Sequence, residues 1–361
     1  MILTFEQISE KVRAGERITD HEALFLFEHP DLLAIGELAA LVNERKNGQR
    51  VFFNVNRHLN HTNVCVNRCR FCAFARSGDE AGAYTYDLAE VRRRAEEALA
   101  QGATEIHIVG GLHPDLPFEF YLEMLRTVKE VSPHLHVKAF TVVEIDYLAR
   151  LAGLSIAETL QELQGAGLGS LPGGGAEILK KEVRDRLCPE KISGERWLEI
   201  MEEVHGAGLK SNATMLYGHL ETYADRVDHM RRLRELQDRT GGFQVFIPLA
   251  FQKENNLLGH LKNPLSGGVD DLKCLAVARI YLDNFTNIKS YWVMVGEKIA
   301  QVSLAFGVND LDGTVVEEKI GHDAGAASPQ AMSREGIVDL IRKAGKIPVE
   351  RDTLYNELRV H

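Results

Sequence analysis

Three cysteines within a run of eight residues constrain this chain more than any other feature. Cys65, Cys69 and Cys72 are separated by three and then two residues, and no fourth cysteine lies nearby. Three thiolates on one tight loop can bind three irons of a [4Fe–4S] cluster and leave the fourth iron open for chemistry, whereas a cluster held by four cysteines normally only carries electrons. The spacing therefore favours a catalytic iron–sulfur centre.

A zinc site is the alternative interpretation of the same loop, with His58 or His61 as the fourth ligand. Zinc sites usually combine two separated pairs of ligands, and this chain has a single group of cysteines. Cys188 and Cys274 stand alone in the sequence, so we expect each to be a buried small apolar side chain. Iron and sulfide analysis against zinc would separate a cluster enzyme from a zinc-bound structural module.

Composition agrees with a cytoplasmic enzyme. The chain has 361 residues and 45% hydrophobic residues, which suits one large barrel or two domains. A net charge of −10 gives no reason to expect nucleic-acid binding. No apolar stretch reaches the ~18 residues of a membrane span, and we expect no secretory signal peptide. Five cysteines, three of them grouped, fit a reducing cytosol rather than a disulfide framework.

Short apolar runs alternate with amphipathic helical patterns along the chain. Such strand–helix repetition produces a parallel sheet with right-handed crossovers. The sequence therefore predicts an α/β fold, a (β/α)8 TIM-type barrel over residues 51–320, with helical extensions at residues 1–50 and 321–361. The expected strands cover residues 51–55, 105–109, 136–140, 168–171, 209–216, 243–251, 288–294 and 314–316.

The chemistry of such a barrel lies at the C-terminal ends of its strands. The second strand leads into Gly110-Gly111, where backbone can approach a ligand closely. The third strand leads to Glu144, and the fourth leads through three glycines to Glu177. Arg196 follows early in the next helix.

The fifth strand carries polar residues within an apolar pattern. Asn212 and Thr214 are predicted to point into the barrel, because alternate residues of a strand face the same side. Tyr217, His219 and Glu221 are predicted to crowd the mouth of the barrel, where we expect them to be catalytic. Pro248-Leu249-Ala250-Phe251 on the sixth strand would supply an apolar wall for an aromatic substrate.

The cysteine loop, with Phe71 just before its last cysteine, resembles the signature of the radical S-adenosylmethionine (SAM) enzymes. The resemblance implies that the open iron chelates the amino and carboxylate groups of SAM. It also implies that Gly110 and Gly111 bind the amino group of methionine. Glu177, with Glu144 as second choice, would bind the ribose hydroxyls or the ammonium, and Arg196 would bind the carboxylate.

The resemblance narrows to the aminofutalosine synthases, which serve the futalosine route to menaquinone, from about residue 50 onward. A sister family, the dehypoxanthine futalosine cyclases, shares several of the motifs and remains the alternative. Ala139-Phe140-Thr141, Pro248-Leu249-Ala250-Phe251 and Asp312-Gly313-Thr314 look like the synthase. The motifs that carry the resemblance also include residues 107–114, 172–177, 213–219, 282–284 and 310–314.

The resemblance implies a defined reaction. A 5′-deoxyadenosyl radical from SAM adds to the vinyl carbon of 3-[(1-carboxyvinyl)oxy]benzoate, and rearrangement with loss of the enolpyruvyl carboxylate gives aminodeoxyfutalosine. Flavodoxin or ferredoxin would donate the electron. The two carboxylates of the substrate call for cations, so Arg279, Lys289 and His219 are predicted to bind them, beside Asn212 and Thr214. An electron-transfer protein is the other class, and it would show no SAM cleavage.

Overall fold

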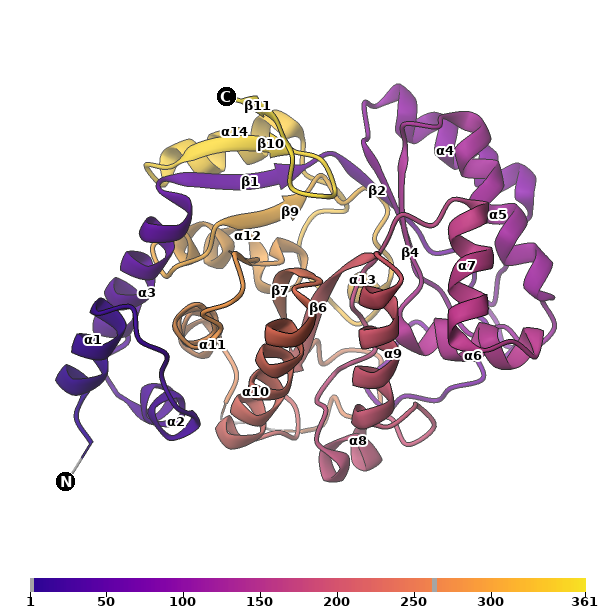
Figure 1. Cartoon of the computed structure of the whole chain (residues 1–361). Helices are drawn as coiled ribbons and strands as arrows, with labels where there is room; N and C mark the ends of the chain where they lie inside the picture. The colour runs from indigo at the N-terminus through magenta and orange to yellow at the C-terminus, as the bar shows by residue number, and fades with distance from the viewer. Residues whose placement is uncertain (1–2, 262–264) are drawn as a thin grey trace.

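The computed structural model describes residues 3–261 and 265–361. Seven of its strands hydrogen-bond in chain order into one parallel sheet, with helices outside it (Figure 1). The seven are β2 (Asn56–Leu59), β3 (Glu105–Ile108), β4 (His136–Ala139), β5 (Ser170–Leu171), β6 (Lys210–Tyr217), β7 (Phe243–Ala250) and β8 (Asn287–Ile288).

A further strand, β9 (Asp310–Gly313), closes this sheet into a ring. On one side, the backbone N–H of Ser290 donates to the carbonyl of Asp310 at 2.9 Å. On the other side, the N–H of His58 on β2 donates to the carbonyl of Val316, three residues beyond β9, also at 2.9 Å. Eight parallel strands therefore surround a common centre, which confirms the predicted (β/α)8 barrel.

Helices pack around the ring, and several begin at side-chain caps that the sequence indicates. Ser155 and Glu158 form a capping box at the start of α7, and the hydroxyl of Ser193 accepts from the N–H of Arg196 at the start of α9. The helices between strands are α4 (Leu88–Ala100), α5 (Phe118–Val131), α6 (Val142–Ala152), α7 (Ile156–Ala166), α8 (Lys181–Leu187), α9 (Gly194–Gly206), α10 (Tyr223–Thr240), α11 (Gly268–Tyr281) and α12 (Trp292–Ser303).

The predicted strand over residues 288–294 is wrong beyond Ile288. Strand β8 ends at Ile288, and α12 begins at Trp292. A short apolar run is compatible with either a buried strand or a buried helix, so periodicity alone does not separate them. A contact between residues far apart in the sequence favours the helix. The indole of Trp292 is buried and donates to the carbonyl of Gly313 at 3.0 Å.

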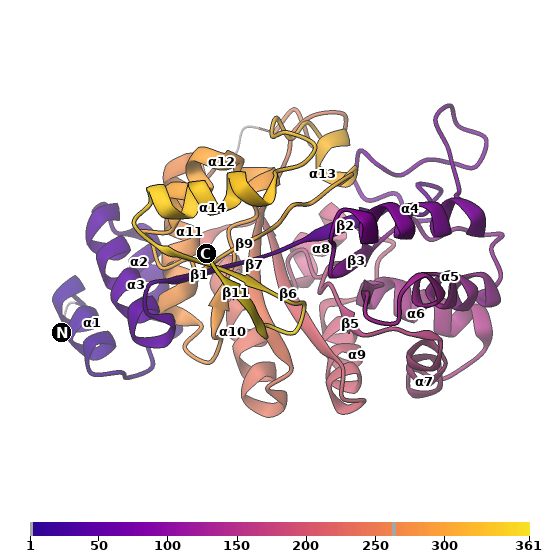
Figure 2. The same ribbon diagram turned by 90° about the horizontal axis from the view of Figure 1, so that it is seen from above.

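The C-terminal extension contains strands as well as helices, so its prediction as helical is incomplete. After α13 (Ile320–Asp323) and α14 (Arg334–Lys343), the chain forms β10 (Ile347–Arg351) and β11 (Glu357–Val360). Strand β10 pairs with β1 (Arg50–Asn54), which runs into β2 after one residue. Seen from above, the extension lies across the barrel (Figure 2).

Side chains of this extension close the end of the barrel at which the strands begin. Thr353 donates to the carboxylate of Glu105 at 2.8 Å, and Arg351 forms an ion pair with Asp310 at 2.7 Å. Glu105 and Asp310 are the first residues of β3 and β9. A ligand therefore has to enter from the opposite end, where the strands finish.

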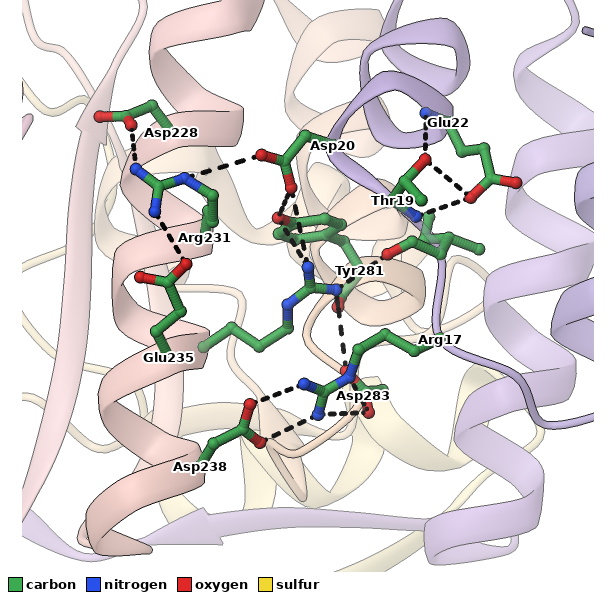
Figure 3. Close-up of polar contacts among 12 residues, drawn as sticks. Arg17, Thr19, Asp20, Glu22, Asp228, Arg231, Glu235, Asp238, Tyr281 and Asp283 are labelled. Carbon is green, nitrogen blue, oxygen red and sulfur yellow. Dashed lines mark hydrogen bonds and ion pairs between the residues drawn. The ribbon is translucent and has the colours of Figure 1, made fainter.

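Three helices precede β1 among the described residues, and they pack on the outside of the barrel. The helices are α1 (Phe5–Arg13), α2 (Asp20–Glu28) and α3 (Leu32–Asn47), and α3 packs along α11. Arg17 contacts Asp238 on α10 at 2.6 Å and Asp283 at 2.9 Å, and the hydroxyl of Tyr281 donates to Asp20 at 2.5 Å (Figure 3). These ion pairs are partly exposed, so the apolar packing supplies most of the attachment.

Within the part of the chain that the structure describes, we find no helix whose length and apolar character would let it cross a membrane.

Candidate functional site

A cavity of about 290 Å³ lies inside the ring toward the C-terminal ends of the strands. Residues from the cysteine loop, from the strands and from α12 and α13 share its lining. The predicted site residues among its lining are Cys65, Cys69, Cys72, Gly110, Gly111, Glu144, Glu177, Asn212, Thr214 and Lys289.

The cysteine loop covers one side of this cavity. Its backbone is held by hydrogen bonds from the N–H of Cys65 to the carbonyl of Arg76 at 3.1 Å and from the N–H of Val66 to the carbonyl of Leu112 at 3.0 Å. Burial raises the pKa of the Cys69 thiol to about 12 and also raises the pKa of Cys72. Such thiols ionise when a bound cation compensates the lost hydration, which is what a metal centre supplies.

The arrangement of the donors fits a cluster better than a single zinc ion. Among the described residues, no three His, Cys, Asp or Glu side chains gather closely enough to hold one metal ion. The three cysteines of a [4Fe–4S] cluster bind three different irons, so they need not meet at one point. His61 is fully buried against Gly110 and is absent from the cavity lining, which removes it as a zinc ligand.

The Gly110-Gly111 segment follows β3 directly and is packed against the cysteine loop. A Cβ at Gly110 would lie 2.4 Å from the ring of His61, and one at Gly111 would lie 2.2 Å from the carbonyl oxygen of Val64. Glycine is therefore required at both positions, at least in part, because His61 and Val64 of the protein itself pack closely against them. They nonetheless line the cavity, so their backbone is also within reach of a ligand.

The carboxylate of Glu144 is used by the backbone around it. It accepts from the N–H of Thr141 at 2.6 Å, in a capping box of α6, and from the N–H of Gly110 at 3.1 Å. Burial outweighs these hydrogen bonds and raises the pKa of Glu144 to about 7. Glu144 thus links the start of α6 to the glycine segment.

Glu177 forms an ion pair that sequence reasoning missed. Its carboxylate lies 2.5 Å from the ammonium of Lys191, and both side chains are largely buried. Burial alone would raise the pKa of Glu177, but Lys191 holds it below its ordinary value. The ammonium of Lys191 also lies 5.2 Å from the ring of Phe71, so it stands beside the cysteine loop. No spacing in the sequence relates residue 191 to the cysteines.

A polar layer lies deeper in the barrel, and most of it was also missed. His58, His107 and Lys138 occupy paired positions on β2, β3 and β4. Asn212 on β6, Lys289 just after β8 and Asp312 on β9 add to the polar lining of the cavity. Their alternation with apolar residues along each strand was the available signal, and it was used only for Asn212 and Thr214.

Three residues predicted to be catalytic lie outside the cavity lining. Tyr217 follows Leu216 on β6 and faces the helix layer, where its hydroxyl donates to Asp271 at 2.7 Å. Glu221 accepts from two backbone N–H groups and forms an ion pair with Arg226 at 2.9 Å. His219 accepts from the N–H of Leu220 through Nδ1 and contacts the carbonyl of Leu216 through Nε2 at 2.9 Å.

Two predicted cationic ligands also lie elsewhere. Arg196 is on the outer side of α9, with a side chain 40% exposed, and it pairs with Glu199 and Asp146. Arg279 is fully buried in α11, where it donates to the carbonyls of Gly307 and Thr286. Neither lines the cavity, so the prediction that they contact SAM or substrate is not supported. Both residues lie on helix faces that point away from the barrel interior.

Comparisons with known proteins agree with this geometry. The family model described as the radical SAM superfamily matches residues 59–233, and the one described as the CofH/MqnC C-terminal region matches residues 240–361. An aminodeoxyfutalosine synthase of Thermus thermophilus is 47% identical over 355 residues, covering 98% of this chain and 95% of that protein.

Enzymes with other names are similar as well. A cyclic dehypoxanthine futalosine synthase of Streptomyces coelicolor is 40% identical, covering 99% of this chain and 89% of that protein. A 5-amino-6-(D-ribitylamino)uracil–L-tyrosine 4-hydroxyphenyl transferase of Methanopyrus kandleri is 46% identical, covering 87% of this chain and 86% of that protein. Among solved structures, methylornithine synthase superimposes with a TM-score of 0.76 at 16% identity, covering 94% of this chain and 97% of that one. That likeness concerns the fold alone.

Proposed function

This chain belongs to the radical SAM superfamily, in the family that includes the aminodeoxyfutalosine synthases, and we propose that it adds the 5′-deoxyadenosyl group of SAM to 3-[(1-carboxyvinyl)oxy]benzoate. The products are 6-amino-6-deoxyfutalosine, methionine and the enolpyruvyl carboxylate as CO2 or bicarbonate. The observation that carries the proposal is the 47% identity to a synthase over 98% of the chain, against 40% to the cyclase.

The cysteine loop would hold a [4Fe–4S] cluster through Cys65, Cys69 and Cys72. When bound, the cluster supplies the single electron that splits SAM into methionine and a 5′-deoxyadenosyl radical. A flavodoxin or a ferredoxin in a reducing cytoplasm suits the supply of that electron. The loop lines the same cavity as the glycine segment and Glu177, which supports a shared site for the cluster and SAM.

The protein mainly has to bind, orient and exclude water. Gly110 and Gly111 present backbone groups to the methionine end of SAM, and Glu177 accepts from its ribose hydroxyls or ammonium. Asn212, Thr214 and Lys289 face the substrate from deeper in the barrel. Leu249 and Tyr291 supply apolar walls that keep quenching water away from the radical. Holding the vinyl carbon against C5′ replaces acid–base catalysis with positioning.

The fate of the adenosine separates the proposal from its alternatives. With SAM labelled in its adenosine carbons, reductant and the enolpyruvyl benzoate, we expect a labelled product of larger mass, one methionine per product and little free 5′-deoxyadenosine. Stoichiometric 5′-deoxyadenosine with dehypoxanthine futalosine consumed would identify a cyclase instead. Parallel assays with L-tyrosine and 5-amino-6-(D-ribitylamino)uracil test the activity named for the Methanopyrus relative.

Glu177→Gln is expected to weaken SAM binding by about 1–3 kcal/mol, the range for losing a hydrogen bond to a charged group. The variant keeps the shape of the side chain but removes its charge, which is held ionised by Lys191. The affinity is measured on unreduced enzyme, with iron content as a check on the cluster. Glu182→Gln, at an exposed position on α8, is the matched control. Unchanged SAM affinity would assign Glu177 to anchoring Lys191 alone.

A further inference from the structure

The deepest part of the cavity is a polar layer in which only Lys289 has been given a role so far. His58, His107 and Lys138 sit at directly paired positions on three adjacent strands, so their side chains share one level of the barrel. Lys289 and Asp312 face the same space from the other side of the ring. The layer below is closed by the contacts of Glu105 and Asp310 with the C-terminal extension. The layer of His58, His107, Lys138, Lys289 and Asp312 is therefore the end of the cavity, and we refer to it as the floor.

One member of the floor carries an unused hydrogen-bonding atom. His58 is 7% exposed, and its Nε2 is buried without a hydrogen-bond partner. Its ring stacks on that of His107 with the centroids 4.3 Å apart. A buried polar atom without a partner costs about 1–3 kcal/mol, so it is normally satisfied by water or a ligand. Nε2 is enclosed by protein, but His58 lines the cavity, so an adjustment of its ring would bring Nε2 to a ligand there.

The floor also holds two buried ammonium groups. Lys138 is 3% exposed and contacts Glu105 at 2.8 Å, and Lys289 is 1% exposed and contacts Asp312 at 3.1 Å. An ammonium has three N–H donors, so one such contact leaves donors that can reach a ligand. Glu105 and Asp312 are compensated by these lysines, and the buried Glu318, which also lines the cavity, pairs with His322 at 3.1 Å, which limits the repulsion of an incoming anion. The floor is thus rich in donors and suited to one carboxylate.

The depth of the floor decides which part of a substrate reaches it. His107 on β3 lies three residues before Gly110, which follows the end of that strand, so it lies deeper by up to about 10 Å at 3.3 Å per residue. Val109, Ile247 and Leu249 line the cavity between these levels. A molecule that reacts at the mouth therefore has an apolar section along these walls and its far end on the floor.

We propose that the floor binds the carboxylate of an aromatic acid, with His58 Nε2 and the ammonium groups of Lys138 and Lys289 as donors, and that it thereby selects substrates with a carboxylate on the ring. The inference rests on the proposed function and deepens it. In the enolpyruvyl benzoate, the vinyl group stays at the mouth and the benzoate carboxylate reaches the floor. The two carboxylates are thereby distinguished: the one on the floor is kept, and the one beside the vinyl carbon is lost.

The test compares two ligands and two side chains at equilibrium, on unreduced enzyme with its cluster and SAM in place. The ligands are 3-[(1-carboxyvinyl)oxy]benzoate and the phenyl analogue that lacks the ring carboxylate. We expect the unaltered enzyme to prefer the benzoate by about tenfold or more, as removal of a charged hydrogen-bond partner implies. His58→Phe is expected to lose part of this preference, because Lys138 and Lys289 still donate, while it binds the phenyl analogue normally, because Phe preserves stacking on His107.

Two further variants complete the experiment. His58→Gln keeps a donor and is expected to retain more of the preference than His58→Phe, which a purely steric role would not produce. His134→Phe, at an exposed position outside the cavity lining, is expected to retain all of it. If the enzyme forms labelled product from the enolpyruvyl benzoate yet binds both ligands equally, or if His58→Phe keeps the full preference, the inference is overturned while the proposed function stands. Absence of that product overturns both.

Discussion

Replacing Cys69 by alanine is expected to abolish the iron content, the broad visible absorbance and the cleavage of SAM together. The same result is expected for Cys65→Ala and Cys72→Ala, because a cluster held by three thiolates has no spare protein ligand. Iron and sulfide are measured after anaerobic reconstitution, and methionine release is measured with reductant. Circular dichroism confirms that the barrel remains folded.

Cys188→Ala is the most informative control for these variants. Cys188 is buried beside Cys69 and Phe71 in a small apolar cluster with Leu216 and Leu258, so it is the cysteine best placed to be a fourth ligand. Cys274 is buried in α11, remote from the loop in sequence and outside the cavity lining. We expect Cys188→Ala and Cys274→Ala to keep nearly full iron content and SAM cleavage. A Cys188 variant as deficient as Cys69→Ala would contradict the three-ligand site.

Gly111→Ala is expected to disturb the cysteine loop and to lower both cluster occupancy and stability. The added Cβ would lie 2.2 Å from the carbonyl oxygen of Val64 and 3.1 Å from the Cβ of Cys65, so backbone next to the first cluster ligand must move. Overpacking of this kind costs about 1–3 kcal/mol, and sometimes more, when backbone rather than a side chain has to shift. Iron content after reconstitution and urea unfolding of the cluster-free protein measure the two effects.

Gly165→Ala supplies the matched control for Gly111→Ala. Gly165 is an exposed residue of α7, and nothing lies within 4 Å of a Cβ added there. Alanine is favoured over glycine within a helix by roughly 0.5–1 kcal/mol, so this variant is expected to be neutral or slightly more stable. Full cluster occupancy and unchanged stability in Gly111→Ala would show that residues 64 and 65 adjust without cost. The glycine would then be needed only for ligand approach.

Much of the secondary structure follows from local patterns. Capping residues such as Thr141, Ser155 and Ser193 act on helix ends a few residues away, and strand alternation is a property of consecutive residues. The failures occur where distant contacts outweigh the local pattern. The run after Ile288 becomes a helix held by Trp292 against Gly313, and residues 347–351 become a strand beside β1. Neither partner is visible in the local sequence.

The residues of the site likewise include some that the order of elements predicts and some that only contacts in the folded chain decide. The cysteine loop, the glycine pair and Glu177 lie at strand ends, and those positions follow from the order of elements along the chain. Lys191 could not be predicted, because α8 separates it from Glu177 within the connection from β5 to β6, and Phe71 lies in a different connection of the barrel. Arg279 and Tyr217 lie outside the cavity lining for another reason. Buried partners, the Gly307 carbonyl and Asp271, already use their polar groups.

The sequence by itself determined the barrel, and it predicted the three cysteines as cluster ligands and the end of the barrel at which chemistry is expected. These features depend on spacing within one loop and on the alternation of strands and helices, which are local or repetitive properties. Only the tertiary structure decided which polar residues face the cavity, because that depends on strand register and ring closure. His58, His107 and Lys138 become neighbours solely because β2, β3 and β4 pair in one register, with residues separated by 49 and 31 positions brought to one level.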